Sequence, residues 1–144
     1  MSDKTLEAIA EAMRDIEFCM FSTKTEGGAL ATCPMSTNRE VEYDGTSRFF
    51  SYEDNRPVLD IKAHPEVSLA FQGSPGLLGG STLFIAASGT ATLIRNKAVF
   101  AEHWTDGLER WIPGGIDTPG LVLITVNTDR LHYWEGEDDG EIVL

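Results

Sequence analysis

Short stretches of apolar and aromatic residues recur along the chain between clusters of glycine, proline, asparagine and aspartate. Stretches of this kind, bounded by turn-forming residues, are typical of β-strands. Seven of them predict strands over residues 17–24, 29–38, 46–52, 67–72, 82–95, 121–126 and 130–134. The breaker-rich segments 73–80 and 112–120 predict loops.

A helical spacing of apolar residues marks other parts of the chain. Helices are predicted over residues 3–16, 55–62 and 97–111. Asp3 or Thr5 is expected to cap the first helix. Pro57 suits the first turn of the second, where its missing N–H needs no acceptor.

Two residues interrupt predicted strands and therefore carry topological information. Pro34 cannot donate to a strand ladder, so its position is expected at a sheet edge or a bulge. Gly89 predicts a bend or bulge in a long strand. Strands outnumber helices, and they do not alternate with them as in a parallel sheet. The order predicts a mainly β (α+β) fold, an antiparallel barrel with peripheral helices.

Length and composition indicate one domain spanning residues 1–144, with 42% hydrophobic residues to build its core. The formal net charge of −12 disfavours nucleic acid and anionic membranes as partners. The acidic segment 135–144 is expected to be a mobile, solvated tail. Two cysteines without metal-ligand spacing indicate a reducing, cytoplasmic setting. No signal peptide or apolar run long enough to span a membrane is apparent.

Residues 49–57 combine a strand end with a helix start. Ser51, Asn55 and Arg56 could bind a phosphate there, because helix N-termini present free N–H groups and arginine adds a forked contact. Spacing alone favours the alternative, in which Asn55 caps the helix and Arg56 points to solvent.

Two other segments could contact a flat heterocycle. A proline bulge within residues 31–35 would free backbone groups to bind a ring edge-on, although an ordinary edge strand is favoured by spacing alone. Trp104 and Trp111 could cover a ring, although such residues more often fill a core or an interface. The three histidines show no paired-ligand pattern, so no metal site is expected. No side chain stands out as catalytic.

In order and spacing, these pieces resemble the pyridoxamine 5′-phosphate oxidase-like flavoproteins, within them the short bacterial general stress protein branch. The matching motifs lie at residues 18–23, 34–35, 49–51, 54–56, 64–71, 88–91, 111–115, 121–126 and 133–134. The resemblance implies a split β-barrel that forms a homodimer, with FMN bound in two sites built from both subunits.

The resemblance also implies which positions contact FMN. Together with the residue patterns, it gives Cys33, Pro34, Met35, Asn38, Phe50, Ser51, Asn55, Arg56 and Trp111. In the family, arginine usually stands at the position of Cys33 and lysine at that of Pro57, and many relatives carry lysine near Asn38. Each of these missing cations would weaken FMN binding by roughly 1.5–3 kcal/mol, the typical strength of a hydrogen bond to a charged group.

The resulting hypothesis is an FMN-dependent oxidoreductase that exchanges a hydride or electrons with a small molecule. Pyridoxamine 5′-phosphate itself is not the expected substrate, because the chain ends in acidic residues where those oxidases carry an arginine-rich extension. The alternatives are a non-enzymatic flavin-binding stress protein and a dimeric split-barrel module that has lost flavin. Apolar residues in segments 83–87 and 121–124 are expected to form the dimer face.

Overall fold

Seven antiparallel strands form one sheet in the computed structural model, which describes residues 4–37, 43–73 and 80–144. The strands are β1 (Phe18–Lys24), β2 (Leu30–Ser36), β3 (Thr46–Tyr52), β4 (Glu66–Gln72), β5 (Leu83–Ile94), β6 (Leu121–Glu135) and β7 (Asp138–Val143). The helices are α1 (Leu6–Met13), α2 (Arg56–Ala63) and α3 (Lys97–His103), followed by the 3₁₀ turns η1 (Asp106–Arg110) and η2 (Gly115–Asp117).

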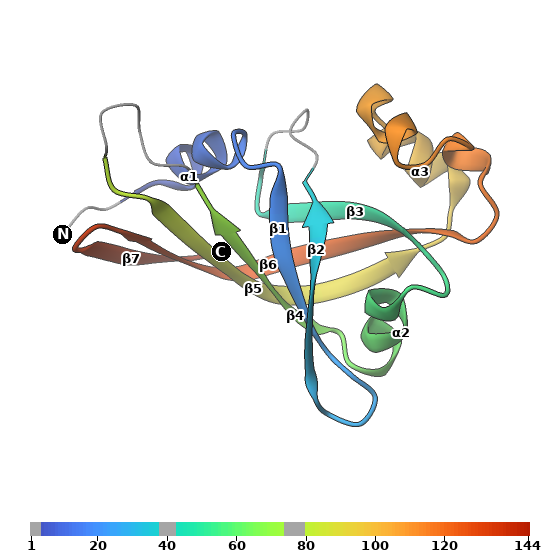
Figure 1. The fold of residues 1–144 in the computed structure, drawn as a ribbon, viewed down its shortest axis with the longest axis horizontal. Coiled ribbons are helices and arrows are strands. Elements are labelled where there is room, and N and C mark those ends of the chain that lie inside the picture. Colours follow the sequence, from blue (N-terminus) through green and yellow to red (C-terminus); the bar gives the residue numbers. More distant parts are fainter. Residues whose placement is uncertain (1–3, 38–42, 74–79) are drawn as a thin grey trace.

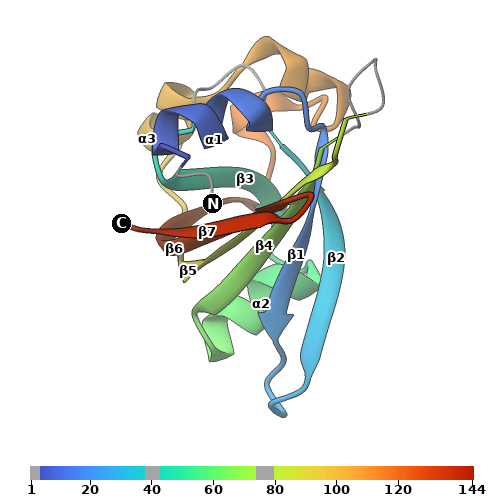
Figure 2. The same ribbon diagram turned by 90° about the vertical axis from the view of Figure 1, so that its left-hand side faces the viewer.

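The strand order is β2-β1-β4-β5-β6-β3, so β2 and β3 lie at opposite ends of the sheet. The sheet curls until its two ends approach each other (Figures 1 and 2). Phe21 of β1 and Phe49 of β3 meet edge-to-face inside it, with ring centroids 5.5 Å apart. The strands therefore enclose a core without closing into a complete barrel. The predicted mainly β split barrel with peripheral helices is confirmed.

Strand β6 is the longest element and the point at which the sheet forks. Its first half pairs with β3 and its second half with β7, while β5 pairs along its other edge. The prediction of two separate strands here is wrong, because β6 continues through residues 127–129. Asn127 and Thr128 pair with Thr90 and Gly89, and Asp129 is the extra residue of a bulge. The register shifts between Ser88 and Gly89, where the bulge places the backbone oxygen of Asn127 next to Gly89. The expected bulge at Gly89 is confirmed.

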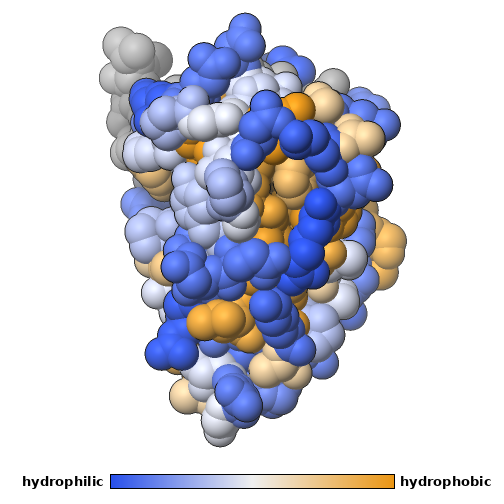
Figure 3. Space-filling model, turned by 90° about the vertical axis from the view of Figure 1, so that its right-hand side faces the viewer, coloured by the Kyte–Doolittle hydropathy of each residue, from blue (hydrophilic) through white to orange (hydrophobic). Residues whose placement is uncertain are grey.

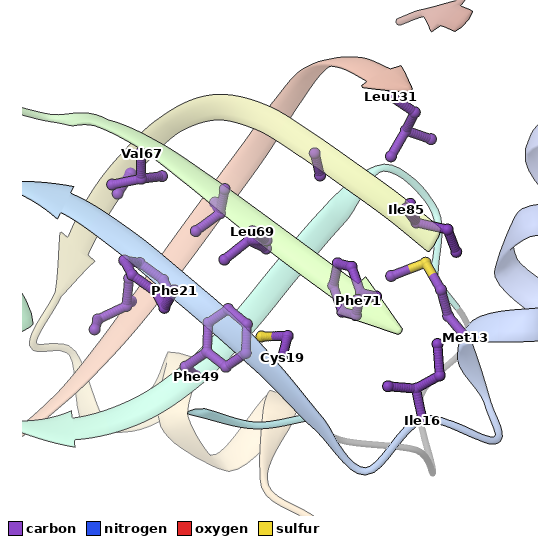
Figure 4. Packing of buried hydrophobic residues seen from close by; sticks show 14 of the residues in the cluster. Met13, Ile16, Cys19, Phe21, Phe49, Val67, Leu69, Phe71, Ile85 and Leu131 are labelled. Atoms are coloured by element: carbon purple, nitrogen blue, oxygen red, sulfur yellow. The ribbon is translucent and has the colours of Figure 1, made fainter. Parts of the chain in front are cut away.

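The main core fills the interior of the curled sheet, as Figure 4 shows. Helix α1 contributes Ile9 and Met13 to this core, and α2 contributes Val58 and Ile61. The side chain of Thr5 accepts a hydrogen bond from the N–H of Ala8 and caps α1. The first helix is shorter than predicted, since it begins at residue 6 and ends at residue 13.

A second, smaller core lies on the opposite face of β3 and β6, under α3. Phe100 and Ile112 pack there on Leu121 and Leu123. The segment 121–124, predicted to form a dimer face, is instead buried within the chain. The third helix ends at His103 rather than at residue 111, and a 3₁₀ turn follows it.

The acidic C-terminal segment is not a mobile tail, because β7 completes the sheet beside β6. Ile142 packs against the main core. His132 of β6 lies between two carboxylates of β7, with Nε2 3.0 Å from Asp139 and Nδ1 3.4 Å from Glu141. Packing and cross-strand polar contacts thus hold in the sheet a segment whose acidic composition predicted a mobile tail.

Candidate functional site

A cleft of about 250 Å³ opens where the barrel fails to close, between the edges of β2 and β3. Residues from α1, β2, β3, α3 and η1 line it. The described lining residues include Met13, Arg14, Met35, Ser36, Thr37, Tyr43, Arg48, Phe50, Ser51, Asn55, His103, Trp111 and Ile112. The side of the molecule that carries α2 and α3 shows apolar residues at its surface between hydrophilic ones (Figure 3).

Backbone groups of both edge strands point into this gap. Directly after β3, the N–H of Glu53 donates to the carbonyl of Gly120, so by alternation the odd-numbered residues of β3 bond to β6. Even-numbered residues, among them Arg48 and Phe50, therefore direct their N–H and C=O groups away from β6. Next to β2, the N–H of Thr37 donates to the carbonyl of Glu17. By the same alternation, the N–H and C=O groups of the preceding residue, Ser36, point away from β1.

Pro34 lies on the edge strand β2, opposite Met20, in a continuous register. Of the two expectations, the edge is therefore correct and the bulge is wrong. Its nitrogen faces the open edge, so no ladder bond is lost. Met35 lines the cleft, whereas Pro34 is exposed on the outer face. Cys33 is half-buried against the main core rather than in the cleft.

At one end of the cleft, the strand end of β3 meets the start of α2. The Asn55 side chain donates a hydrogen bond from Nδ2 to the Ser51 hydroxyl at 2.8 Å and does not cap the helix. Both side chains line the cleft. Arg56 follows with an exposed side chain outside the cleft lining. Because Pro57 has no N–H, Asn55, Ser51 and Arg56 supply the donors at this helix start.

Aromatic residues form one wall of the cleft. Phe50 packs edge-to-face on Trp104, with centroids 5.1 Å apart, and this contact joins β3 to α3. Trp111 is half-exposed in the cleft, 6.5 Å from the ring of Phe18. The guanidinium of Arg110 lies over the Trp111 ring. This wall could cover one face of a flat ring system.

Titratable groups near the cleft have distinct environments. Burial raises the pKa of the Cys33 thiol, and the nearby Asp60 carboxylate raises it further. Burial also raises the pKa of Tyr43, whose hydroxyl lies 2.7 Å from the Thr128 hydroxyl. Neither group is therefore disposed to ionise near neutral pH, and Cys33 is not an activated nucleophile.

The structure brings together five of the nine predicted site residues, namely Met35, Phe50, Ser51, Asn55 and Trp111. Cys33, Pro34 and Arg56 do not line the cleft, and Asn38 lies outside the described residues.

Sequence reasoning missed Arg14, Arg48 and His103, which also line the cleft. Arg48 could have been found, because it lies two residues before Phe50 on the same strand. No local signal places the ends of two distant helices beside that strand.

In the described parts of the chain, no group of three or more His, Cys, Asp or Glu residues could hold a metal ion. No helix among them is both long and apolar enough to cross a membrane.

Comparison with known proteins gives a family and a fold. The family model described as pyridoxamine 5′-phosphate oxidase like matches residues 4–144. The structure is similar to General Stress Protein 26 from Bacillus anthracis str. Sterne, with a TM-score of 0.73, 20% identity and coverage of 94% of this chain and 95% of that chain. No curated protein matches the chain.

Two further solved structures share the fold. A Clostridium acetobutylicum protein related to general stress protein 26 has a TM-score of 0.75 and 20% identity, covering 93% of this chain and 90% of that one. A heme binding protein from Mycobacterium smegmatis has a TM-score of 0.70 and 12% identity, covering 99% and 59%. At these identities the likeness establishes the fold alone.

Proposed function

Since the chain belongs to the pyridoxamine 5′-phosphate oxidase-like family, we propose that it binds FMN in the cleft between β2 and β3. FMN is a flat heterocycle with a hydrogen-bonding edge, joined by a ribityl chain to a phosphate. One observation carries the proposal. The cleft combines backbone groups that two strand edges direct away from their paired strands with the Ser51–Asn55 pair at a helix start.

The donors present suit each part of this cofactor. The Ser51 hydroxyl, the Asn55 side chain, the helix start and the neighbouring Arg56 would hold the phosphate. Backbone groups of Phe50 and Ser36, which face the gap, would bond to the ring edge. The Trp111 side chain would cover part of the ring system.

We infer that the protein is an oxidoreductase acting on a small molecule. The flavin, when bound, supplies the hydride or electron transfer. The chain's own residues bind it, orient its ring against the edge of β3, and limit the access of water through the apolar wall. No side chain is required as an acid or base for this role.

Pyridoxamine 5′-phosphate is not the substrate we propose. In this chain, the C-terminal segment forms β7, which carries Asp138, Asp139 and Glu141. The segment therefore supplies no arginine that could bind the phosphate of such a substrate. FMN-loaded protein is expected to yield no pyridoxal 5′-phosphate from pyridoxamine 5′-phosphate in air.

We also propose that the protein is a homodimer. On the outer face of the sheet, Met20, Phe84 and Trp134 are 40–44% exposed, and a group of large apolar side chains on one face is typical of an interaction surface. Phe18 belongs to the same face and contacts Trp111 at the cleft. A second subunit on this face would reach the cleft. The cleft volume of about 250 Å³ lies below the roughly 300–1,000 Å³ of ligand pockets, which suits a site completed by a partner.

The absorbance spectrum of the purified protein, with an FMN titration of the cofactor-free form, tests the proposal. Flavin bands, or saturable quenching of FMN fluorescence, are expected. A Soret band would indicate heme instead. If neither flavin nor heme bands appear and FMN does not bind, the result favours a module without cofactor. If flavin is bound, bleaching by reduced nicotinamide followed by turnover in air supports an oxidoreductase. Its absence favours a non-enzymatic flavin-binding protein.

A further inference from the structure

The charge of the cleft is opposite to that of the chain. The sequence holds 23 Asp and Glu against 11 Lys and Arg. Among the described residues lining the cleft, Arg14 and Arg48 carry positive charge and none is Asp or Glu. The described part of the lining is therefore basic although the chain as a whole is acidic, an arrangement that favours an anionic ligand locally.

The basic side chains come from three elements that meet beside the cleft. Arg48 is on β3, and its side chain lies on the same side of the strand as Phe50, which packs on α3. His103 ends α3, and Arg14 is the C-cap of α1. Contacts between η1 and the start of β1 close this wall, including an Arg110–Glu17 ion pair at 3.2 Å.

Arg48 is separated from the end of the cleft assigned to the cofactor phosphate. It precedes Ser51 by three residues, a distance of about 10 Å along an extended strand. In the part of the chain that the structure describes, no carboxylate forms an ion pair with it. A guanidinium can bind both oxygens of a carboxylate or phosphate through two parallel hydrogen bonds.

We propose that this end of the cleft binds the anionic group of the small molecule on which the flavin acts, with Arg48 as the main contact. That the ligand is a substrate rests on the proposed function, whereas the binding of an anion at this end of the cleft does not require flavin. Phe50 and Trp111 line the same cleft. The ligand class is therefore a small molecule with an apolar or aromatic body and one carboxylate or phosphate group.

The test uses three probes of similar shape, benzoate, phenyl phosphate and the neutral benzamide. Binding is followed by tryptophan fluorescence and by saturation-transfer NMR of the probe, with the protein both free of FMN and saturated with it. The variants are Arg48→Gln, Arg48→Lys and, as a matched control outside the cleft, Arg95→Gln. Circular dichroism checks that each variant is folded.

Wild type is expected to bind at least one anionic probe about tenfold or more tightly than benzamide. Arg48→Gln should remove this preference and leave benzamide and FMN binding unchanged. Arg48→Lys should keep part of the preference for the anionic probe, and Arg95→Gln should keep all of this preference. Tighter binding of benzoate would indicate that the site binds a carboxylate, and tighter binding of phenyl phosphate that it binds a phosphate.

Equal binding of the three probes by wild type, or an unchanged preference in Arg48→Gln, overturns the inference. So does a tenfold or greater loss of FMN affinity in Arg48→Gln, because Arg48 would then hold the cofactor phosphate. If wild type binds no flavin but prefers an anionic probe through Arg48, the proposed function fails and the anion site stands.

Discussion

The side-chain amide of Asn55 donates a hydrogen bond to the hydroxyl of Ser51 across 2.8 Å. This bond joins the end of β3 to the residue that precedes α2, and both side chains face the cleft. It also withdraws the Asn55 side chain from capping its own helix. In the first turn, the N–H groups of Val58 and Leu59 bond to the carbonyl of Asn55, and Pro57 has no N–H. The backbone donor that the helix start can offer to the phosphate we propose is therefore the N–H of Arg56.

Arg56→Ala is expected to weaken FMN binding by roughly 1.5–3 kcal/mol, because Arg56 is the only full positive charge in this group of donors. Riboflavin lacks the phosphate and should bind to the variant as it does to wild type. Quenching of flavin fluorescence measures both affinities. Arg130→Ala, an exposed arginine on β6, serves as the control. Equal losses for FMN and riboflavin would place the phosphate elsewhere.

Phe84→Glu is expected to convert the proposed dimer into a monomer, because it puts a charge at the centre of the exposed apolar face. Light scattering should give about twice the 15.8 kDa chain mass for wild type and the chain mass for the variant. Leu59→Glu, at an exposed apolar residue of α2, is the control and should not change the mass. A monomeric wild type contradicts the proposed dimer.

Gly89→Ala is expected to lower the free energy of unfolding by about 1–3 kcal/mol, as overpacking does in tight sites. A Cβ at Gly89 would lie 2.1 Å from the backbone oxygen of Asn127, so the fork in β6 would have to shift. Urea denaturation measures the change. Gly27→Ala is the control, since a Cβ there meets nothing within 4 Å. Equal stabilities would show that the bulge can relax at no cost.

The Glu53 carboxyl is expected to titrate well below its ordinary pKa of 4.5. Arg95 and Lys62 contact it and lower its pKa to about 2. A lowered pKa in the folded state means that the contribution to stability is present above 4.5 and is lost as the pH falls towards 2. Carbon-13 NMR of the side-chain carboxyl measures the pKa directly. In Arg95→Ala the pKa should move back towards 4.5, and an unchanged value would contradict the assignment of its cause.

The Cys19 thiol is expected to resist alkylation at pH 8 until the protein unfolds. Burial is the main reason that its pKa is raised to about 12, and the nearby Cys33 adds to the effect. Little thiolate is therefore present to react. Timed labelling with iodoacetamide and peptide mass mapping follow each cysteine separately. Half-buried Cys33 should react first, and the reverse order would contradict this account.

The sequence predicts most of the β-strands because their apolar residues and flanking turn residues are local signals. Strand β3 is predicted with both its ends, and Ser51 and Asn55 follow from the strand end and helix start that flank them. The edge position of Pro34 follows from its missing N–H in the same way.

The features that sequence patterns do not predict depend on distant contacts. Residues 127–129 have the composition of a turn, yet β6 stays continuous through them, because Asn127 pairs with Thr46 on one side and Thr90 on the other. The acidic β7 has little intrinsic strand propensity, and Ile142 and the partners of His132 hold it in place. Likewise, only the tertiary fold shows that Arg14 and His103 face the same cleft.

The open seam between β2 and β3 has a consequence for how the protein behaves at high concentration. Two uncovered edge strands can pair with a strand of a neighbouring molecule, and repeated pairing of this kind leads to aggregation. On β2, Pro34 presents a ring instead of an N–H at the outward-facing position, so an incoming strand could not pair there without a gap. The protein can thus keep its binding entrance uncovered without that edge strand becoming a template for aggregation.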